Sequence, residues 1–227
     1  MLAPNPADTV LDLCAAPGGK TLQALELMQA KAGPGGQVTG AVFANDADPE
    51  RCMELLPMIL RKSKHPGVAV VLGSAAKFPQ SFDTDPVAPR LFDRVLCDVP
   101  CSGDGTVRKA PALWSSWRVG DGLSLHGRQL QILCHGLHLL KPGGRLVYST
   151  CSINPIENEA VVAAALAKYK GTVFLEPAPV DVSPLEIQQG LQTWSVSTEE
   201  GVVYTKWDDV PPEHRKPAGP LAQTMFP

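Results

Sequence analysis

The sequence predicts an α/β fold built on a doubly wound, mainly parallel sheet. Short apolar runs alternate along the chain with segments whose apolar residues recur at helical spacing, which is typical of parallel sheets covered by helices. The run at residues 10–13 passes through Pro17, Gly18 and Gly19 directly into such a segment, which indicates a strand, a tight turn and a helix. Several runs are followed by polar or thiol side chains, at the edge where parallel sheets bind ligands. These side chains belong to Cys14, Asp46, Asp98 and Cys151.

The individual elements are predicted from runs and breaks in the sequence. The predicted strands are residues 10–13, 38–44, 68–72, 92–97 and 145–149. Helices are predicted after Thr21, from Pro49, through residues 130–140, and from Asn154 to about residue 168. Residues 141–144 form a helix-stop pattern, and Asn154 with Glu157 matches a helix-capping pattern. Short strands are predicted near Trp194, residues 202–204 and Trp207.

The overall composition is that of a globular protein. The chain has 227 residues, of which 44% are hydrophobic and 19% charged, so we expect one domain over residues 1–227. It has no apolar run long enough to cross a bilayer, and its N-terminus lacks the pattern of a secretory leader. The six cysteines are scattered without metal-type CxxC pairs, which favours reduced thiols. We therefore expect an intracellular protein of the nucleus or cytoplasm with no membrane or metal partner; the sequence does not indicate an oligomeric state.

The net charge restricts the choice of partner. Proteins that hold nucleic acid by themselves usually carry a basic excess, whereas this chain has a net charge of −3. Either its ligand is small, or part of the binding surface lies outside this chain. The first predicted strand begins almost at the N-terminus, which favours the second option.

The glycine turn has three interpretations. Gly19, Lys20 and Thr21 resemble the end of a triphosphate-binding loop, but that motif requires glycine where Cys14 stands. Pro17 also removes an N–H group from the phosphate cradle. A turn that serves only helix packing stays open, as does a turn that binds a small polar ligand at the helix N-terminus.

Asp46 and the cysteines carry the remaining chemistry. An acid at the end of a second strand accepts hydrogen bonds from ribose hydroxyls in nucleotide-binding folds, although Asp46 also suits a helix N-cap. Cys101 and Cys151 each follow a predicted strand, so a thiolate nucleophile with a thiol partner or a redox pair fits. Three further cysteines are predicted to be buried apolar residues, namely Cys52, Cys97 and Cys134.

Four motifs in order resemble the Nop/Sun-type RNA (cytosine-5)-methyltransferases. They are Leu-Asp-Leu-Cys-Ala-Ala-Pro-Gly-Gly-Lys-Thr, Asn-Asp-Ala-Asp, Asp-Val-Pro-Cys-Ser-Gly-Asp-Gly-Thr and Tyr-Ser-Thr-Cys-Ser-Ile-Asn-Pro-Ile-Glu-Asn-Glu. The resemblance covers residues 10 to about 168, and the final Met-Phe-Pro resembles the end of the family's catalytic region. Residues 102–109 are most similar to the eukaryotic tRNA-modifying branch. The resemblance implies a Rossmann-like class I methyltransferase fold, with the family's upstream RNA-binding part absent from this chain.

The resemblance also implies a cofactor, S-adenosyl-L-methionine, and a set of site residues. The implied cofactor cradle is Cys14, Ala15, Ala16, Pro17, Gly18, Gly19 and Lys20, with Asp46 on the ribose and Asp98 between cofactor and base. Cys151 is the implied nucleophile, and Cys101 assists product release. The family's third cofactor acid aligns near Gly73 and Ser74, where no acid stands, so only the Ser74 hydroxyl is available to the adenine region.

The implied reaction is methylation of cytosine at carbon 5, through a covalent bond between Cys151 and carbon 6. The implied partner is RNA, and within it tRNA, with the target base single-stranded or flipped out of its stack. The candidate RNA contacts are Arg108, Lys109, Trp114, Trp117 and Arg118. The alternative is that the cations are solvated loop charges and the tryptophans belong to the core. We expect this chain to bind cofactor but to methylate RNA weakly or not at all by itself.

Two other function classes compete with this interpretation. A dinucleotide-dependent oxidoreductase would use the same scaffold, but it requires a GxGxxG turn that the sequence lacks. An RNA-binding module without a cofactor would carry more positive charge than this chain does.

Overall fold

The computed structural model describes residues 1–62, 67–80, 91–177, 187–216 and 219–227, which divide into two compact units. The first, here called the sheet unit, consists of Met1–Val99 and Ile132–Ser149. The second, here called the cysteine unit, consists of Pro100–Gln131 and Thr150–Pro227. That one catalytic domain spans residues 1–227 stays a prediction.

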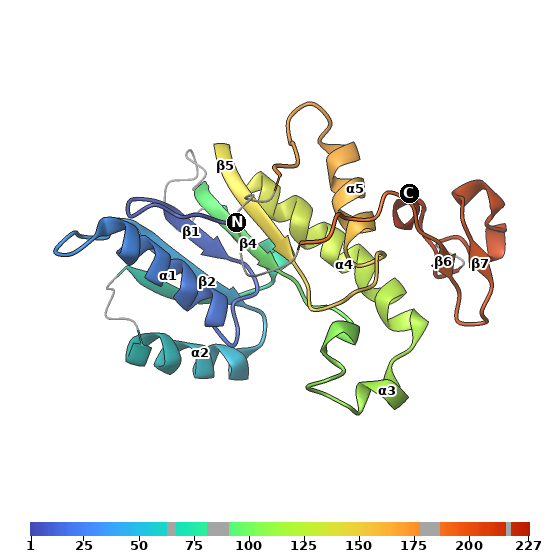
Figure 1. Cartoon of the computed structure of the whole chain (residues 1–227), viewed down its shortest axis with the longest axis horizontal. Coiled ribbons are helices and arrows are strands. Elements are labelled where there is room, and N and C mark those ends of the chain that lie inside the picture. The colour runs from blue at the N-terminus through green and yellow to red at the C-terminus, as the bar shows by residue number, and fades with distance from the viewer. Residues whose placement is uncertain (63–66, 81–90, 178–186, 217–218) are drawn as a thin grey trace. The chain divides into compact units, whose positions relative to one another are not determined.

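The sheet unit contains a five-stranded parallel sheet (Figure 1), with the strand order β3-β2-β1-β4-β5. The strands are β1 (Thr9–Asp12), β2 (Ala41–Asp46), β3 (Val68–Leu72), β4 (Phe92–Asp98) and β5 (Leu140–Ser149). In the centre, Leu11 of β1 pairs with Phe43 of β2 on one side and Val95 of β4 on the other. The predicted parallel sheet is confirmed, and the carboxyl ends of all five strands share one edge because the strands are parallel.

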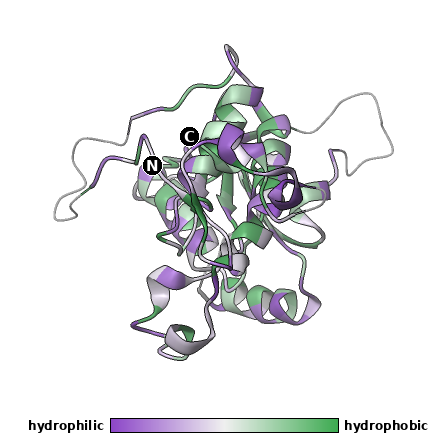
Figure 2. Ribbon diagram, turned by 90° about the vertical axis from the view of Figure 1, so that its right-hand side faces the viewer, coloured by the Kyte–Doolittle hydropathy of each residue, from purple (hydrophilic) through white to green (hydrophobic). Residues whose placement is uncertain are grey.

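Both faces of the sheet are covered, as a doubly wound fold requires. Alternate residues of a strand point to opposite faces, so Val10 packs into one apolar cluster and Leu11 into the other. Helices α1 (Gly19–Ala32) and α2 (Pro49–Lys62) lie on the Val10 face (Figure 1). Ile132, in the C-terminal part of α4 (Val119–His138), packs on the Leu11 face. Figure 2 shows the central strands largely in the hydrophobic colour, as expected for a sheet buried on both faces.

Strand β5 begins earlier than the sequence predicts. Leu140, predicted to end the preceding helix, pairs with Phe92 in the sheet, and the pairing resumes at Arg94 with Arg145. Residues 141–144 therefore form an irregularity within the strand, and Gly143 has a φ of 76°, which favours glycine. The helix prediction was wrong for Leu140. Its spacing from the preceding leucines fits a helix, but the residue pairs with Phe92 of β4 as part of the sheet.

Helix α5 (Glu159–Lys168) begins later than the sequence predicts. The side chain of Asn154 accepts a hydrogen bond from the Ile156 N–H at 3.0 Å, and residues 155–158 form turns. The predicted capping pattern is wrong because the carboxylate of Glu157 binds groups elsewhere in the cysteine unit.

The cysteine unit has its own apolar core. It contains α3 (Leu113–Ser116), the first part of α4, α5 and an antiparallel pair of short strands, β6 (Val196–Ser197) and β7 (Val203–Tyr204). Trp207, predicted in a strand, lies in a short 3-10 helix and packs its ring edge-on to Phe226. The buried core residues are Leu123, Ile156, Val196, Val210, Leu221, Met225 and Phe226. In the described part of the chain, no helix is both long and apolar enough to span a membrane.

Candidate active site

Residues 14–20 lead from β1 into the first turn of α1 in the sheet unit. Side chains from elsewhere in the unit bind both the N–H and the carbonyl of Ala16 in this turn. The Ala16 N–H donates to the Asp46 carboxylate at 3.1 Å, and the Ala16 carbonyl accepts from the Arg51 guanidinium at 2.6 Å. Gly18 has a φ of 97°, and a Cβ there would overlap Leu55 and Met58 of α2. Only glycine fits this position without strain.

The N-terminus of α1 is open to a ligand. Gly18 caps the helix without any side-chain hydrogen bond, and the first turn contains no acidic residue. A Cβ on Gly19 would meet nothing within 4 Å, so there is free space beside the first N–H groups. N–H groups of a first helical turn lack partners inside the helix and suit a carboxylate or another anion.

Asp12 was missed as a site residue by the sequence analysis. It is buried beneath the turn, where its carboxylate accepts from the Thr21 hydroxyl at 2.7 Å and from the Cys14 N–H at 3.4 Å. Burial raises the pKa of Asp12 to about 7. The available signal was a charged residue inside the apolar run at residues 10–13.

The thiol of Cys14, in the same turn, lies near the carboxylates of Asp12 and Asp46. Burial, followed by the neighbouring carboxylates Asp12 and Asp46, raises the pKa of Cys14 to about 12. Cys14 therefore stays a protonated thiol at neutral pH, and a thiol is a poor nucleophile. This supports its assignment to the cofactor turn rather than to covalent chemistry.

Asp46 ends β2 and is buried. One carboxylate oxygen accepts from the Ala16 N–H, and the other accepts from the Asp48 N–H at 3.1 Å. The N-cap of α2 is Asp48, whose side chain accepts from the N–H groups of Glu50 and Arg51 at 2.9 and 3.2 Å. The capping role considered for Asp46 thus belongs to Asp48.

Ser74 follows β3 and is exposed, and its side chain makes no capping hydrogen bond to the 3-10 helix that comes next. The neighbouring strand ends are joined instead by Asn45. Its amide donates to the carbonyls of Leu13 and Gly73 at 2.9 and 3.0 Å. Asn45, which the sequence analysis did not single out beyond its motif, therefore links the ends of β1 and β3 across β2.

Asp98 ends β4 and forms an ion pair with Lys20 of α1, with Nζ and Oδ2 separated by 2.7 Å. Its other oxygen accepts from the hydroxyl of Ser149, the last residue of β5, at 2.6 Å. The Asp98 side chain is 29% exposed, so it is fixed in position while still accessible. The structure thus brings together two residues of the predicted cofactor set, Lys20 and Asp98.

The cysteine unit brings together Cys101 and Cys151. Their sulfurs are 3.2 Å apart, and the Cys151 N–H also points to the Cys101 sulfur at 3.3 Å. Cys151 is exposed and Cys101 half-buried. Burial, with the hydrogen bond to Cys151 second, raises the pKa of Cys101 to about 12. All six cysteines are free, and Cys52, Cys97 and Cys134 are buried as predicted.

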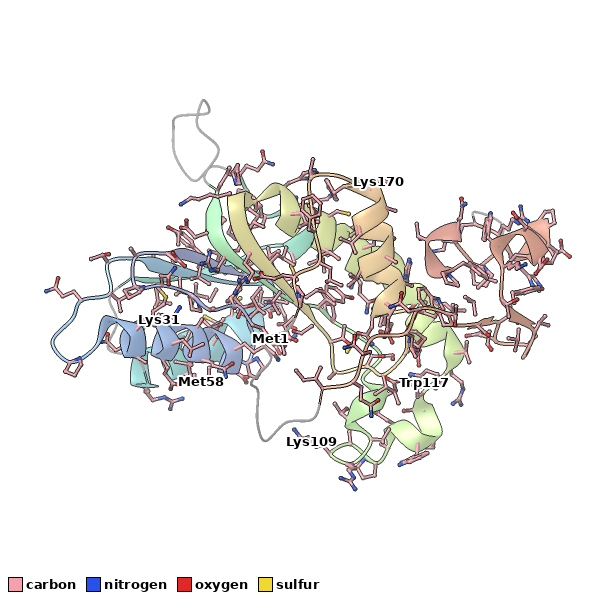
Figure 3. All side chains as sticks on the ribbon, turned by 45° about the horizontal axis from the view of Figure 1, so that its top comes forward. Met1, Lys31, Met58, Lys109, Trp117 and Lys170 are labelled. Carbon is pink, nitrogen blue, oxygen red and sulfur yellow. The ribbon has the colours of Figure 1, made fainter. Side chains whose placement is uncertain are left out.

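The cationic and tryptophan side chains proposed to contact RNA differ in exposure. Trp114 is 79% exposed, which excludes the core alternative for this residue, whereas Trp117 is half-buried at the end of α3. Arg108, Lys109 and Arg118 are exposed, and Lys109 projects from the loop before α3 (Figure 3). Within the described residues, no three His, Cys, Asp or Glu side chains are grouped so as to hold a metal ion.

Comparisons with known proteins agree with the motifs. Residues 1–206 match the family model described as 16S rRNA methyltransferase RsmB/F. The chain is 41% identical, over 91% of its length, to tRNA (cytosine(34)-C(5))-methyltransferase of Drosophila melanogaster, and covers 28% of that protein. It is 44% identical, over 92% of its length, to multisite-specific tRNA:(cytosine-C(5))-methyltransferase of Saccharomyces cerevisiae, and covers 31% of that protein.

A solved structure supports the same grouping. The crystal structure of NSun6 from Pyrococcus horikoshii with SFG superposes with a TM-score of 0.61 at 30% identity, covering 74% of this chain and 38% of that one. The predicted class I methyltransferase fold and the resemblance to cytosine-5 methyltransferases are thereby confirmed. This chain spans less than a third of the length of the two relatives named above. By its matched residues and its fold, the chain belongs to the 16S rRNA methyltransferase RsmB/F family.

Proposed function

We propose that this chain is the catalytic part of an S-adenosylmethionine-dependent RNA methyltransferase that forms 5-methylcytosine, with tRNA as its substrate. The observation that carries the proposal is the pair of thiols, Cys101 and Cys151, with sulfurs 3.2 Å apart. The names of the relatives from Drosophila melanogaster and Saccharomyces cerevisiae support the tRNA substrate. Membership of a methyltransferase family disfavours the oxidoreductase and the binding module.

The edge of the sheet unit fits S-adenosylmethionine. The uncapped first turn of α1, beside the open space at Gly19, suits the carboxylate of its methionine part. Asp46 accepts one hydrogen bond on each oxygen, and the Arg51 guanidinium lies 3.9 Å from Oδ2, which leaves acceptor capacity for a ribose hydroxyl. Ser74 is exposed and its hydroxyl is available to the adenine region. When bound, the cofactor supplies an electrophilic methyl group.

Cys151 supplies the nucleophile in this proposal. Carbon 5 of cytosine reacts poorly with electrophiles, but addition of the Cys151 sulfur to carbon 6 makes the ring enamine-like and loads electron density onto carbon 5. The exposed position of Cys151 allows a cytosine to approach. A base within a duplex cannot reach such a thiol, so the target cytosine is unpaired or flipped out.

Cys101 assists the release of the product. After methylation, carbon 5 gives its proton to a base from solvent, such as water, and the bond between carbon 6 and the Cys151 sulfur breaks, with the electron pair of that bond returning to the sulfur. A protonated Cys101 is a hydrogen-bond donor, and its pKa of about 12 keeps it protonated at neutral pH. At 3.2 Å it is close enough to stabilise the departing sulfur.

The exposed cations and Trp114 supply a contact surface for RNA in the cysteine unit. Arg108 and Lys109 can neutralise phosphates, and Trp114 offers a stacking face for an unpaired base. A tRNA substrate supports a location inside the cell, and we propose the nucleus or the cytoplasm.

The test is methyl transfer from labelled S-adenosylmethionine to tRNA transcripts, with bisulfite sequencing of the product. The wild-type chain, alone or joined to a separate RNA-binding part, is compared with Cys151→Ala and with Cys134→Ala as the matched control. We expect Cys151→Ala to abolish transfer and Cys134→Ala to retain it per folded molecule. Retained methylation in Cys151→Ala would overturn the proposal.

A further inference from the structure

A buried carboxylate connects the two cysteine loops within the cysteine unit. Glu157 is 0% exposed and accepts from the Ser102 N–H at 2.8 Å, the Ser102 hydroxyl at 2.5 Å and the Ser152 hydroxyl at 2.9 Å. Ser102 follows Cys101 directly, and Ser152 follows Cys151 directly. One carboxyl group therefore binds the neighbour of each reactive cysteine.

A second side chain extends this network to the other flank of Cys101. The amide of Gln129, on α4, donates to Glu157 at 2.9 Å and to the Pro100 carbonyl at 3.0 Å. Cys101 thus lies between two residues, Pro100 and Ser102, that are both held through Gln129 and Glu157. The Cys151 loop has a further backbone contact, from the Gly105 N–H to the Cys151 carbonyl at 3.1 Å.

The free-energy cost of burying the Glu157 carboxylate restricts the geometry of this network. Removing a carboxylate from water is unfavourable unless donors replace the lost hydration. The four donors around Glu157 offset this cost only while both loops stay within hydrogen-bond distance of the same carboxyl group. The charged acceptor therefore limits how far the two cysteine loops can move apart.

We propose that Glu157 is a positioning residue that sets the separation of the Cys101 and Cys151 sulfurs, and thereby the rate of product release. The proposal rests on the roles given to these cysteines under the proposed function. Addition to cytosine needs only the Cys151 sulfur, whereas release needs Cys101 in contact with it. Weakening the Glu157 network therefore slows release more than addition.

The first test measures the separation of the thiols without RNA or cofactor. Diamide oxidises two neighbouring thiols to a disulfide, each thiol losing a proton and an electron while diamide is reduced to the hydrazine. Closure of the Cys101–Cys151 disulfide is followed by peptide mapping in wild type, Glu157→Gln and Ser152→Ala. Glu159→Gln, the same change two residues along, is the matched control.

We expect closure to slow by about tenfold in Glu157→Gln, in line with the weakening of hydrogen bonds to a charged group, and to be unchanged in Glu159→Gln. Ser152→Ala removes the link from Glu157 to the Cys151 loop, together with the hydrogen bond from the Asn154 N–H to the Ser152 hydroxyl, and is expected to slow closure by about threefold. Thermal unfolding of each variant identifies loss of the fold; if Glu157→Gln does not fold, Ser152→Ala decides. Wild-type closure rates in the folded variants would overturn the proposal.

The second test uses RNA and separates this proposal from the proposed function. With tRNA and S-adenosylmethionine, Glu157→Gln is expected to raise the ratio of covalent protein–RNA adduct to methylated product, whereas a purely structural role lowers both together. An unchanged ratio would contradict the positioning role. Absence of adduct and product in the wild type joined to an RNA-binding part would instead contradict the proposed function, and the diamide result would still test the position of the thiols.

Discussion

The predicted cofactor residues of the sheet unit and the thiol pair of the cysteine unit are held by different means. In the sheet unit, the predicted cofactor residues lie at strand ends and in a turn, where the conformation of Gly18 and several separate side-chain contacts, such as those of Asp46 and Asn45, set the geometry. In the cysteine unit, Cys101 and Cys151 lie in loops whose position depends on buried side chains, above all Glu157. The comparison indicates that the geometry of the sheet edge rests on many independent contacts, whereas that of the cysteine pair rests on a single buried acceptor.

Asp98 is the side chain on the sheet edge whose loss is expected to have the largest effect. Asp98→Asn removes the charge that pairs with Lys20 at 2.7 Å, at the end of β4 nearest to the cysteine loops in sequence. We expect methyl transfer to fall by about 10²- to 10³-fold, within the range for a group that acts directly on reacting atoms. Initial rates with labelled S-adenosylmethionine measure the effect.

The matched control for Asp98 is Asp93→Asn in the same strand. Asp93 pairs with Lys141 at 2.9 Å, in the irregularity of β5. We expect this variant to keep its transfer rate per folded molecule. Equal losses in the two variants would show that the Asp98 ion pair serves only the strand, and would remove it from the site.

Gly18 tests whether the backbone sets the cofactor turn. Gly18→Ala forces a side chain into a φ of 97° and against Leu55 and Met58, so we expect a loss of about 2–4 kcal/mol in the free energy of unfolding. Cofactor binding should weaken in parallel, as measured by calorimetry. Gly19→Ala, which adds a methyl group to open space within α1, is the control for stability only, and should leave the free energy of unfolding unchanged or raise it by up to about 1 kcal/mol. Equal stability of the two variants would contradict the role of the backbone.

Asp12 gives the sheet unit a pH dependence. Its pKa is about 7 in the folded protein against an ordinary 3.8, so over this interval the folded chain keeps a proton that the unfolded chain has lost. Its contribution to stability is therefore largest below about pH 4 and is lost as the pH rises towards 7. We expect Asp12→Asn to gain stability relative to wild type over that interval.

Urea unfolding at several pH values measures the Asp12 effect, with Glu26→Gln as a control for the loss of one exposed carboxylate. A difference between Asp12→Asn and wild type that does not vary with pH would mean that Asp12 is ionised throughout.

Ser74 is expected to have the smallest effect. Its exposed side chain makes no capping hydrogen bond to the following 3-10 helix, so Ser74→Ala should leave the unfolding temperature unchanged. We expect S-adenosylmethionine binding to weaken by about threefold or less, the size of one neutral hydrogen bond in water. Calorimetry that finds a tenfold or larger loss would give Ser74 a central role in holding the adenine.

The sheet unit was predictable because its signals are local. Strand β3 coincides with the predicted run at residues 68–72, and the glycine turn leads into α1 as expected. Leu140 was predicted wrongly because helical spacing and a strand register both bury it. Local patterns of this kind predict a strand end to within one or two residues: the strands predicted to end at residues 44 and 97 end at Asp46 and Asp98.

The cysteine unit was less predictable because its contacts are distant in sequence. Glu157 matched a capping pattern with Asn154, but it binds Ser102, 55 residues away. The sequence predicted that Cys101 and Cys151 both follow strands, and therefore that they are candidates, but it did not predict their separation. That separation depends on Gln129, Ser102 and Ser152, whose polar side chains resemble ordinary loop residues when the sequence is taken alone.

In the proposed function, Cys151 forms the bond to cytosine and Cys101 releases the product. The most direct measurement is denaturing electrophoresis of Cys101→Ala after incubation with tRNA and S-adenosylmethionine, followed by peptide mapping of any protein that carries RNA. We expect a covalent adduct at Cys151, present in Cys101→Ala and absent from the variant in which both cysteines are alanine. Product release at the wild-type rate by Cys101→Ala, or an adduct at any other cysteine, would contradict the claim.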